Sequence, residues 1–175
     1  IKVASVLGGD FDAHLLAAIH PLSLDEGLIA EQLDDLARRD LIRPTETGFA
    51  FRHAVVQESA YEQLPLSMRR RLHEQVATKI EEAGSDATQY PLLAHHWEAA
   101  GHLEPALDYL EGAGAAALEA GAFDDAASFL SAALVRADKL DARGSELPAT
   151  RCAYIHQSLG EAMAGQGRLE PAADE

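Results

Sequence analysis

The sequence predicts a mainly α-helical protein with one small β-hairpin and a series of antiparallel helical hairpins. The 175-residue chain is 47% hydrophobic and only 6% aromatic, which is typical of packed helices rather than of a β-sandwich. Apolar residues recur at helical spacing over most of the chain, and only one short segment has the character of paired strands. A motif that begins with glycine also recurs in the second half, which indicates repeated helical units.

The first forty residues predict three helices. Residues 1–19 carry apolar side chains at helical spacing on both sides of a G-G-D-F-D break, which predicts two short helices. The segment that begins at Ser23 has Glu26 three positions later, as in a capping box, and apolar residues on one face. We therefore expect a third helix that begins at Ser23 and ends near Arg39.

A β-hairpin is expected between Leu41 and His53. The string L-I-R-P-T-E-T-G-F-A-F-R-H contains two short extended runs around a T-E-T-G turn. Pro44 has no N–H to donate, so its strand must lie at an edge. Three helices followed by a hairpin is the order of a winged helix, and residues 1–64 are predicted to form such a domain.

Two further helices are expected over Ala54–Leu64 and Ser67–Glu82, separated by Pro65 and ended by an A-G-S-D turn. We predict that residues 65–86 are a connecting helix between the winged helix and the region that follows. Its first turns carry the triplet Arg69–Arg71. We interpret the triplet as a solvated face, because three basic residues are too few to define a nucleic-acid site.

Beyond residue 86 the sequence repeats itself. G-H-L-E-P-A-L-D begins at Gly101, G-A-F-D-D-A-A-S at Gly121 and G-R-L-E-P-A-A-D at Gly167. In each copy a glycine ends one helix, an acidic residue opens the next, and an alanine follows where two helices approach closely. We predict tetratricopeptide-like helical hairpins over residues 87–175. Because such units do not bury their apolar faces alone, and because the chain opens inside an apolar periodic segment, we expect it to be a piece of a longer protein.

The composition excludes several classes of protein. A formal net charge of −15 opposes binding to phosphates, and the predicted third helix follows the same sign, with Arg38 and Arg39 as its only basic residues. The acidic residues of that helix and its ends are Asp25, Glu26, Glu31, Asp34, Asp35 and Asp40. No apolar run approaches the roughly 20 residues that span a bilayer, and no signal peptide is evident, so we expect a cytoplasmic protein without a membrane partner. The single cysteine, Cys152, forms no internal disulfide and is interpreted as a small buried side chain.

No catalytic constellation is evident in the sequence. A phosphate-binding loop would need G-x-x-x-x-G-K-[ST], and no such string occurs. The neighbours His95 and His96 would point about 100° apart on a helix, and no metal-binding spacing occurs among the other histidines. We therefore predict no catalytic residue, no metal ligand and no cofactor in this chain. A small enzyme with an unrecognised active site stays as an alternative.

The string F-R-H-A-V-V-Q-E-S-A-Y-E-Q-L, residues 51–64, resembles a segment of STAND-type signalling ATPases, particularly the bacterial ones fused to class III adenylate cyclase domains or to LuxR-type regulators. V-A-S-V-L-G-G-D-F-D and L-I-R-P before it, and R-R-R-L-H-E-Q-V-A, L-A-H-H-W-E-A-A-G and A-L-D-Y-L after it, resemble the same family in the same order. The resemblance covers essentially the whole chain.

The resemblance implies a nucleotide-binding domain upstream, which would bind ATP or ADP with Mg²⁺, and superhelical repeats downstream. Relatives in plants and animals carry a histidine in an M-H-D motif after the hairpin, and that histidine contacts the ADP phosphates. His53 in R-H-A is similarly placed, with Arg52 and Ala54 in place of methionine and aspartate. We expect His53 and Arg52 to sense nucleotide only together with the upstream domain. The alternative is that His53 is a buried histidine that ties the hairpin to the next helix.

The sequence thus predicts a regulatory and scaffolding region without enzymatic activity of its own. The winged helix would relay the nucleotide state, and the helical repeats would offer a surface to a protein or small-molecule effector. Trp97, Tyr109 and Phe123 are candidates for that surface, although aromatic residues at helical spacing also suit a core. A nucleic acid is not expected as a partner. The alternative function is that of a DNA-binding winged-helix transcriptional regulator.

Overall fold

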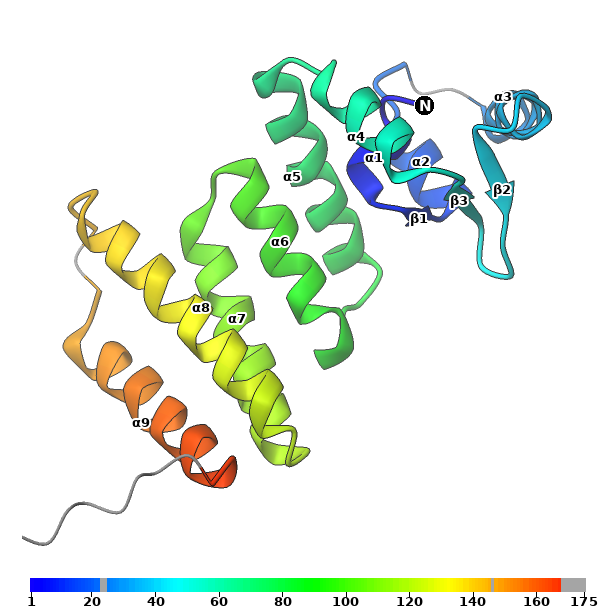
Figure 1. Ribbon diagram of the computed structural model, residues 1–175. Coiled ribbons are helices and arrows are strands. Elements are labelled where there is room, and N and C mark those ends of the chain that lie inside the picture. The colour runs from blue at the N-terminus through cyan, green and yellow to red at the C-terminus, as the bar shows by residue number, and fades with distance from the viewer. Residues whose placement is uncertain (23–24, 146, 168–175) are drawn as a thin grey trace, which may run out of the picture. The chain divides into compact units, whose positions relative to one another are not determined.

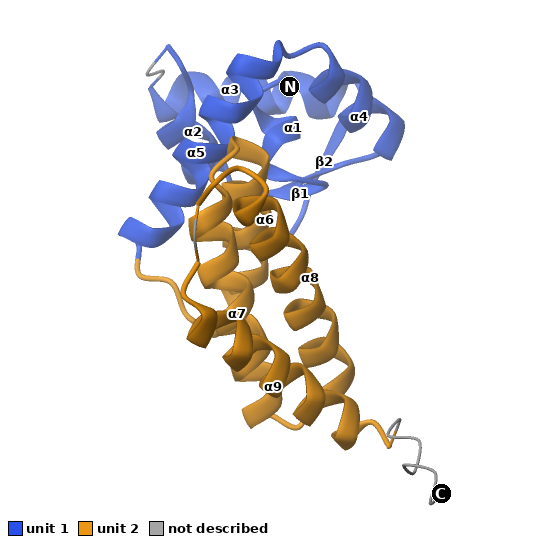
Figure 2. Ribbon diagram, turned by 90° about the vertical axis from the view of Figure 1, so that its left-hand side faces the viewer, with its two compact units in different colours: residues 1–83 blue, residues 84–175 orange. Residues whose placement is uncertain are grey.

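The computed structural model describes residues 1–22, 25–145 and 147–167, and it is mainly helical, as predicted (Figure 1). The chain divides into two compact units, residues 1–83 and 84–175 (Figure 2). The elements are α1 (Ala4–Leu7), β1 (Asp10–Phe11), α2 (Ala13–Ile19), α3 (Glu26–Arg38), β2 (Ile42–Pro44), β3 (Phe49–Phe51), α4 (Ala54–Glu62), α5 (Leu66–Glu82), the 3-10 helix η1 (Ala87–Gln89), α6 (Tyr90–Ala100), α7 (Leu103–Glu119), α8 (Phe123–Asp141) and α9 (Ala149–Gly165).

The first unit has the order of elements of a winged helix. Helix α1, strand β1 and helices α2 and α3 precede the β2–β3 hairpin, and the three strands form an antiparallel sheet in the order β1-β3-β2. Strand β2 lies at an edge and ends at Pro44, as expected. The expectation that the hairpin is the only paired segment was wrong, because β1 joins the sheet. A strand of two residues is too short to show alternation, and its partner lies about forty positions further along the chain.

Strand β3 is the centre of this sheet. Asp10 pairs with Ala50 on one side and Arg43 pairs with Ala50 on the other. The Phe51 N–H also donates to the Gly9 carbonyl at 2.8 Å. At Gly48 the backbone passes so close to β1 that a Cβ atom would lie 2.3 Å from the Phe11 carbonyl oxygen.

Side-chain caps fix the starts of α2 and α3. The Asp12 carboxylate accepts a hydrogen bond from the Leu15 N–H at 2.8 Å and caps α2. Asp25 caps α3 by accepting from the Gly27 N–H at 2.7 Å. The expectation of a capping serine at the start of α3 is therefore corrected to Asp25, and Ser23 itself lies outside the described residues.

Helix α5 belongs to the first unit and is not a separate connector. Its buried residues Leu72, Val76 and Ile80 recur every four positions and form one apolar face. This face packs within the winged-helix unit, where α5 contacts α1 and α2. The boundary between units consequently lies at residues 83 and 84 rather than near residue 64.

The second unit is a series of antiparallel helices, α6 to α9, in which each packs against the next (Figure 1). Gly101 and Gly121 follow α6 and α7 in the left-handed region, with φ of 98° and 71°, as the repeated motif predicts. The alanines of the two motifs, Ala106 and Ala126, are completely buried where neighbouring helices meet. Of the third copy, only Gly167 is among the described residues.

Substituting Gly48 with alanine should destabilise the first unit by roughly 2 kcal/mol or more, because the added Cβ would overlap the Phe11 carbonyl and because the φ of 155° disfavours a side chain. Gly9→Ala is the matched control, since a Cβ there meets no atom within 4 Å. Urea unfolding followed by far-ultraviolet circular dichroism measures both changes. Equal stability of the two variants would contradict the close approach of β1 and the hairpin.

Candidate functional site

The junction between β3 and α4 holds the two residues predicted to sense nucleotide. His53 occupies the N-cap position of α4 in an extended conformation, with φ −136° and ψ 128°, and its side chain makes no capping hydrogen bond. Its carbonyl accepts from the Val56 N–H at 3.0 Å and so starts the helix. The side chain is exposed. The alternative that His53 is buried between hairpin and helix was therefore wrong.

Arg52 is anchored to the segment that leads into the other strand of the hairpin, at the same open end. Its Nε–H donates to Asp40 Oδ1 at 2.8 Å, and its backbone N–H donates to the Leu41 carbonyl at 3.1 Å. Asp40 adopts a left-handed conformation with φ 62° at the turn after α3. The Arg52 side chain is 45% exposed, so the ion pair orients the guanidinium more than it stabilises the fold.

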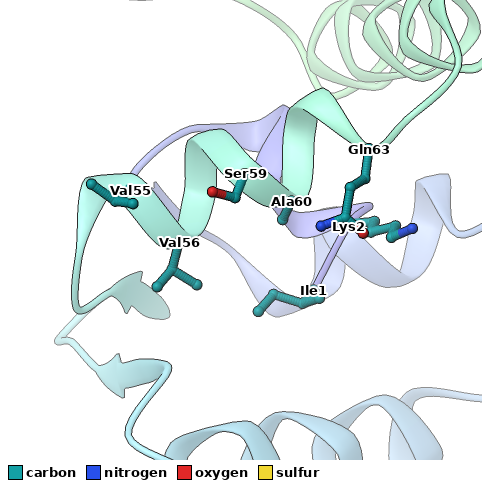
Figure 3. A pocket seen from close by; sticks show the side chains of 7 residues that line it. All are labelled: Ile1, Lys2, Val55, Val56, Ser59, Ala60 and Gln63. Atoms are coloured by element: carbon teal, nitrogen blue, oxygen red, sulfur yellow. The ribbon is translucent and has the colours of Figure 1, made fainter.

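An exposed apolar surface continues from His53 along α4. Val55 is 69% exposed, and Val56, Ser59 and Gln63 line a surface pocket of about 270 Å³ together with Ile1, Lys2, Val55 and Ala60 (Figure 3). Val56 and Ile1 border the same opening in Figure 3. No sequence motif predicted this surface, although two valines, Val55 and Val56, follow His53 closely in the string. A junction with polar donors beside apolar side chains is suited to contact with another protein surface.

The buried histidine of this region is His73, which the sequence analysis did not single out. His73 is 2% exposed, and its Nε2 lies 2.9 Å from the Tyr61 hydroxyl. Arg69 stacks over the Tyr61 ring at 4.7 Å and donates to the carbonyls of Leu64 and Glu62. The interpretation of the whole arginine triplet as a solvated face was therefore wrong for Arg69, which fixes the turn between α4 and α5. Arg70 and Arg71 are exposed, as expected.

The aromatic candidates of the helical repeats pack against neighbours within the second unit. All three are half-buried. The Trp97 ring lies 5.6 Å from the His102 ring, and the Tyr109 ring lies 5.5 Å from that of Tyr90. Phe123 occupies the space beside Gly165, where a Cβ would lie 2.4 Å from its ring. These contacts account for the three residues as packing elements. Cys152 is half-buried rather than buried.

Two ion-pair clusters join helices that are not neighbours in sequence. Glu98 of α6 accepts hydrogen bonds from Arg136 and from Lys139, at 3.4 Å, of α8. Partial burial tends to raise the pKa of Glu98, but the hydrogen bonds and charges of Arg136 and Lys139 prevail and lower it. In the same way Arg151 of α9 donates to Glu111 at 2.7 Å and to Asp108, both on α7.

The hydrogen bond to Glu111, helped by Asp108, raises the pKa of Arg151 against the opposing effect of its burial. Helices α6 and α8, and α7 and α9, are thus cross-linked by charge.

Within the described ranges, no three His, Cys, Asp or Glu side chains lie close enough together to hold a metal ion. The described helices also include none that is both long and apolar enough to cross a bilayer.

An uncharacterized protein of Rhizobium meliloti (strain 1021) is 28% identical to this chain over 139 residues, which cover 76% of this chain and 13% of that protein. The chain therefore spans a small part of the length of this relative. No family model and no solved structure matches the chain.

Replacement of His53 with alanine should change the free energy of unfolding by less than about 0.5 kcal/mol, since the side chain is exposed and makes no capping bond. Replacement of the buried His73 with alanine should lower the free energy of unfolding by about 2 kcal/mol or more, because it opens a cavity and removes the partner of Tyr61. Far-ultraviolet circular dichroism follows both units, whereas fluorescence of Trp97, the single tryptophan, follows the second. A large loss of stability in the His53 variant would show that this side chain has a structural role.

Substitution of Glu98 with glutamine should lower the stability of the second unit by roughly 1 kcal/mol at neutral pH, because Arg136 and Lys139 lose their charged partner. The pKa of Glu98 is lower in the folded state, so its contribution is present above the unfolded-state pKa and is lost as the pH falls through the folded-state pKa.

The difference between wild type and variant should therefore be clearly smaller at pH 3 than at pH 7, because the contribution begins to be lost below the usual glutamate pKa of about 4.3. Urea unfolding followed by Trp97 fluorescence at both pH values measures the difference. The exposed Glu161, for which no ion pair is found among the described residues, supplies the control Glu161→Gln. A pH-independent difference would mean that Glu98 acts through packing and not through its charge.

Proposed function

We propose that this chain is a regulatory region of a STAND-type signalling ATPase and has no enzymatic activity of its own. The winged-helix unit would relay the nucleotide state of an upstream domain that binds ATP or ADP with Mg²⁺. The helical hairpins would begin a surface for a protein or small-molecule effector. On this proposal the protein works in the cytoplasm, where these nucleotides are available.

The observation that carries the proposal is the exposed pair Arg52 and His53 at the β3–α4 junction. An imidazole N–H and a guanidinium donate charge-assisted hydrogen bonds to phosphate oxygens. Asp40 holds the Nε–H of Arg52, and a guanidinium has five N–H donors in total. The exposed Val55 beside them offers an apolar contact to the upstream domain. The order of a winged helix followed by helical repeats supports the same assignment.

A DNA-binding regulator is the second candidate, and the winged-helix topology favours it. The recognition helix of such a protein would be α3. On α3 the acids Glu26, Glu31 and Asp34 are exposed, and Arg39 is paired with Asp35 at 2.7 Å. Carboxylates in that position repel the phosphate backbone. A mobility shift with random duplex DNA at low salt, and its loss at higher salt, would favour this candidate over the ATPase.

In the intact protein, His53→Ala should accelerate ADP dissociation about 10- to 100-fold while ATP dissociation changes little, and it should raise basal output. The expected size follows from one charge-assisted hydrogen bond, roughly 1.5–3 kcal/mol, made mainly in the ADP-bound closed state. Stopped-flow release of fluorescent ADP and ATP analogues measures the effect. His156→Ala, which removes an exposed histidine of α9, is the control.

The isolated 175-residue chain should bind neither nucleotide at micromolar concentration in calorimetry, because the phosphate cradle lies in the upstream domain on this proposal. Equal rates of ADP dissociation from the intact wild type and the His53 variant would contradict the nucleotide-sensing role of His53. The absence of a phosphate-binding loop upstream of this segment in the complete reading frame would remove the ATPase assignment altogether.

A further inference from the structure

A second surface pocket of the winged-helix unit lies between α2, α3 and β3, and its volume is about 360 Å³. Its floor is apolar and consists of Ile29, Leu33 and Phe49. Ile29 and Leu33 belong to the buried core, and Phe49 is half-buried. Gly27 and Ala30 of α3 also line the pocket, and they are too small to cover its floor. The pocket therefore exists because α3 carries small residues where it faces solvent.

The rim of the pocket is acidic. Glu26 and Asp34 of α3 line it and are exposed. His14 of α2 lies 3.3 Å from one Glu26 oxygen, Nδ1 to Oε1. Within the described part of the chain Asp34 has no ion-pair partner, and no lysine or arginine lines the pocket. Asp25 and Glu31 add negative charge along the same helix.

We propose that this pocket binds a basic amphipathic segment of another protein. One apolar side chain of the segment would fill the floor over Ile29, Leu33 and Phe49, and flanking lysine or arginine side chains would pair with Glu26 and Asp34. An apolar anchor with charge complementarity at the rim is a common mode of peptide recognition. The volume lies at the lower end of the range of roughly 300–1,000 Å³ for ligand pockets, which suits a side chain better than a large ligand.

The sign of the charge selects a protein segment over a nucleic acid. Phosphates that approached this face would meet carboxylates, whereas ammonium and guanidinium groups would be attracted. Because Glu26 and Asp34 are exposed, each ion pair is weak and screened by salt. The apolar side chain consequently supplies most of the affinity, and the acids supply selectivity. This inference does not depend on the proposed nucleotide-sensing role, because it uses neither Arg52 nor His53.

The test is fluorescence anisotropy with the whole 175-residue chain. The probe is a labelled peptide of about 15 residues that carries leucine on one helical face and lysine or arginine on the other. Two matched peptides replace either every leucine with serine or every basic residue with glutamate. We expect only the first peptide to bind, with an affinity that falls as salt is added.

Variants of the pocket locate the binding. The double variant Glu26→Gln with Asp34→Asn should weaken binding about tenfold, the combined effect of two exposed ion pairs. Ala30→Phe should weaken it at least as much by filling the pocket. Glu31→Gln removes one negative charge from α3 outside the lining of this pocket, against two in the double variant, and should change affinity less than about threefold. Circular dichroism verifies the fold of each variant.

Three outcomes would overturn the proposal. Binding that is as weak in Glu31→Gln as in the double variant and in Ala30→Phe would show a nonspecific charge effect. Duplex DNA that binds this face in preference to the peptide would identify a nucleic-acid surface instead. Self-association in sedimentation experiments that excludes the peptide and is lost on Ala30→Phe would identify a second copy of the chain as the occupant.

Discussion

The central position of β3 is the constraint on which the winged-helix unit depends. This three-residue strand pairs with β1 on one side and β2 on the other, so it joins two strands that are about thirty residues apart in the chain. Gly48 allows the hairpin to pass directly over the Phe11 carbonyl. Because β3 leads immediately into α4, its pairing also determines where His53 is presented. Phe49 of the same strand forms part of the floor of the α2–α3 pocket.

The second unit is held together by a different mechanism. Its helices approach closely because alanines such as Ala106 and Ala126 occupy the contacts, and left-handed glycines reverse the chain between them. Ion pairs then connect alternate helices, from Glu98 to Arg136 and from Arg151 to Glu111. Local repetition therefore determines the antiparallel hairpins, while the charge pairs add contacts between helices that are not adjacent in sequence.

The charge distribution gives the winged-helix scaffold an unusual surface. Exposed acids follow α3, the helix that would read DNA in a DNA-binding relative of this fold, while Arg52 lies at the β3–α4 junction. On the two proposals, the same fold would carry two surfaces of opposite charge preference. The junction at His53 would contact an anion, and the α2–α3 pocket would bind a basic segment over its apolar floor. This division follows from particular side chains and not from the fold itself.

The sequence alone determined the helical class, the hairpin with its edge at Pro44, and the turns at Gly101 and Gly121. These features depend on local periodicity, on proline and on glycine, whose effects act within a few residues. It also offered Arg52 and His53 as site candidates, but only through the resemblance of R-H-A to a family motif, and their role stays a prediction.

The tertiary structure decided the features that depend on distant partners. Strand β1 exists because β3 offers it a partner, and α5 joins the first unit because its apolar face covers α1 and α2. Burial likewise distinguishes His73 from His53, which look alike in sequence: one faces Tyr61 inside the unit and the other faces solvent. The exposure of a side chain is set by what the rest of the chain places around it, and no local pattern contains that information.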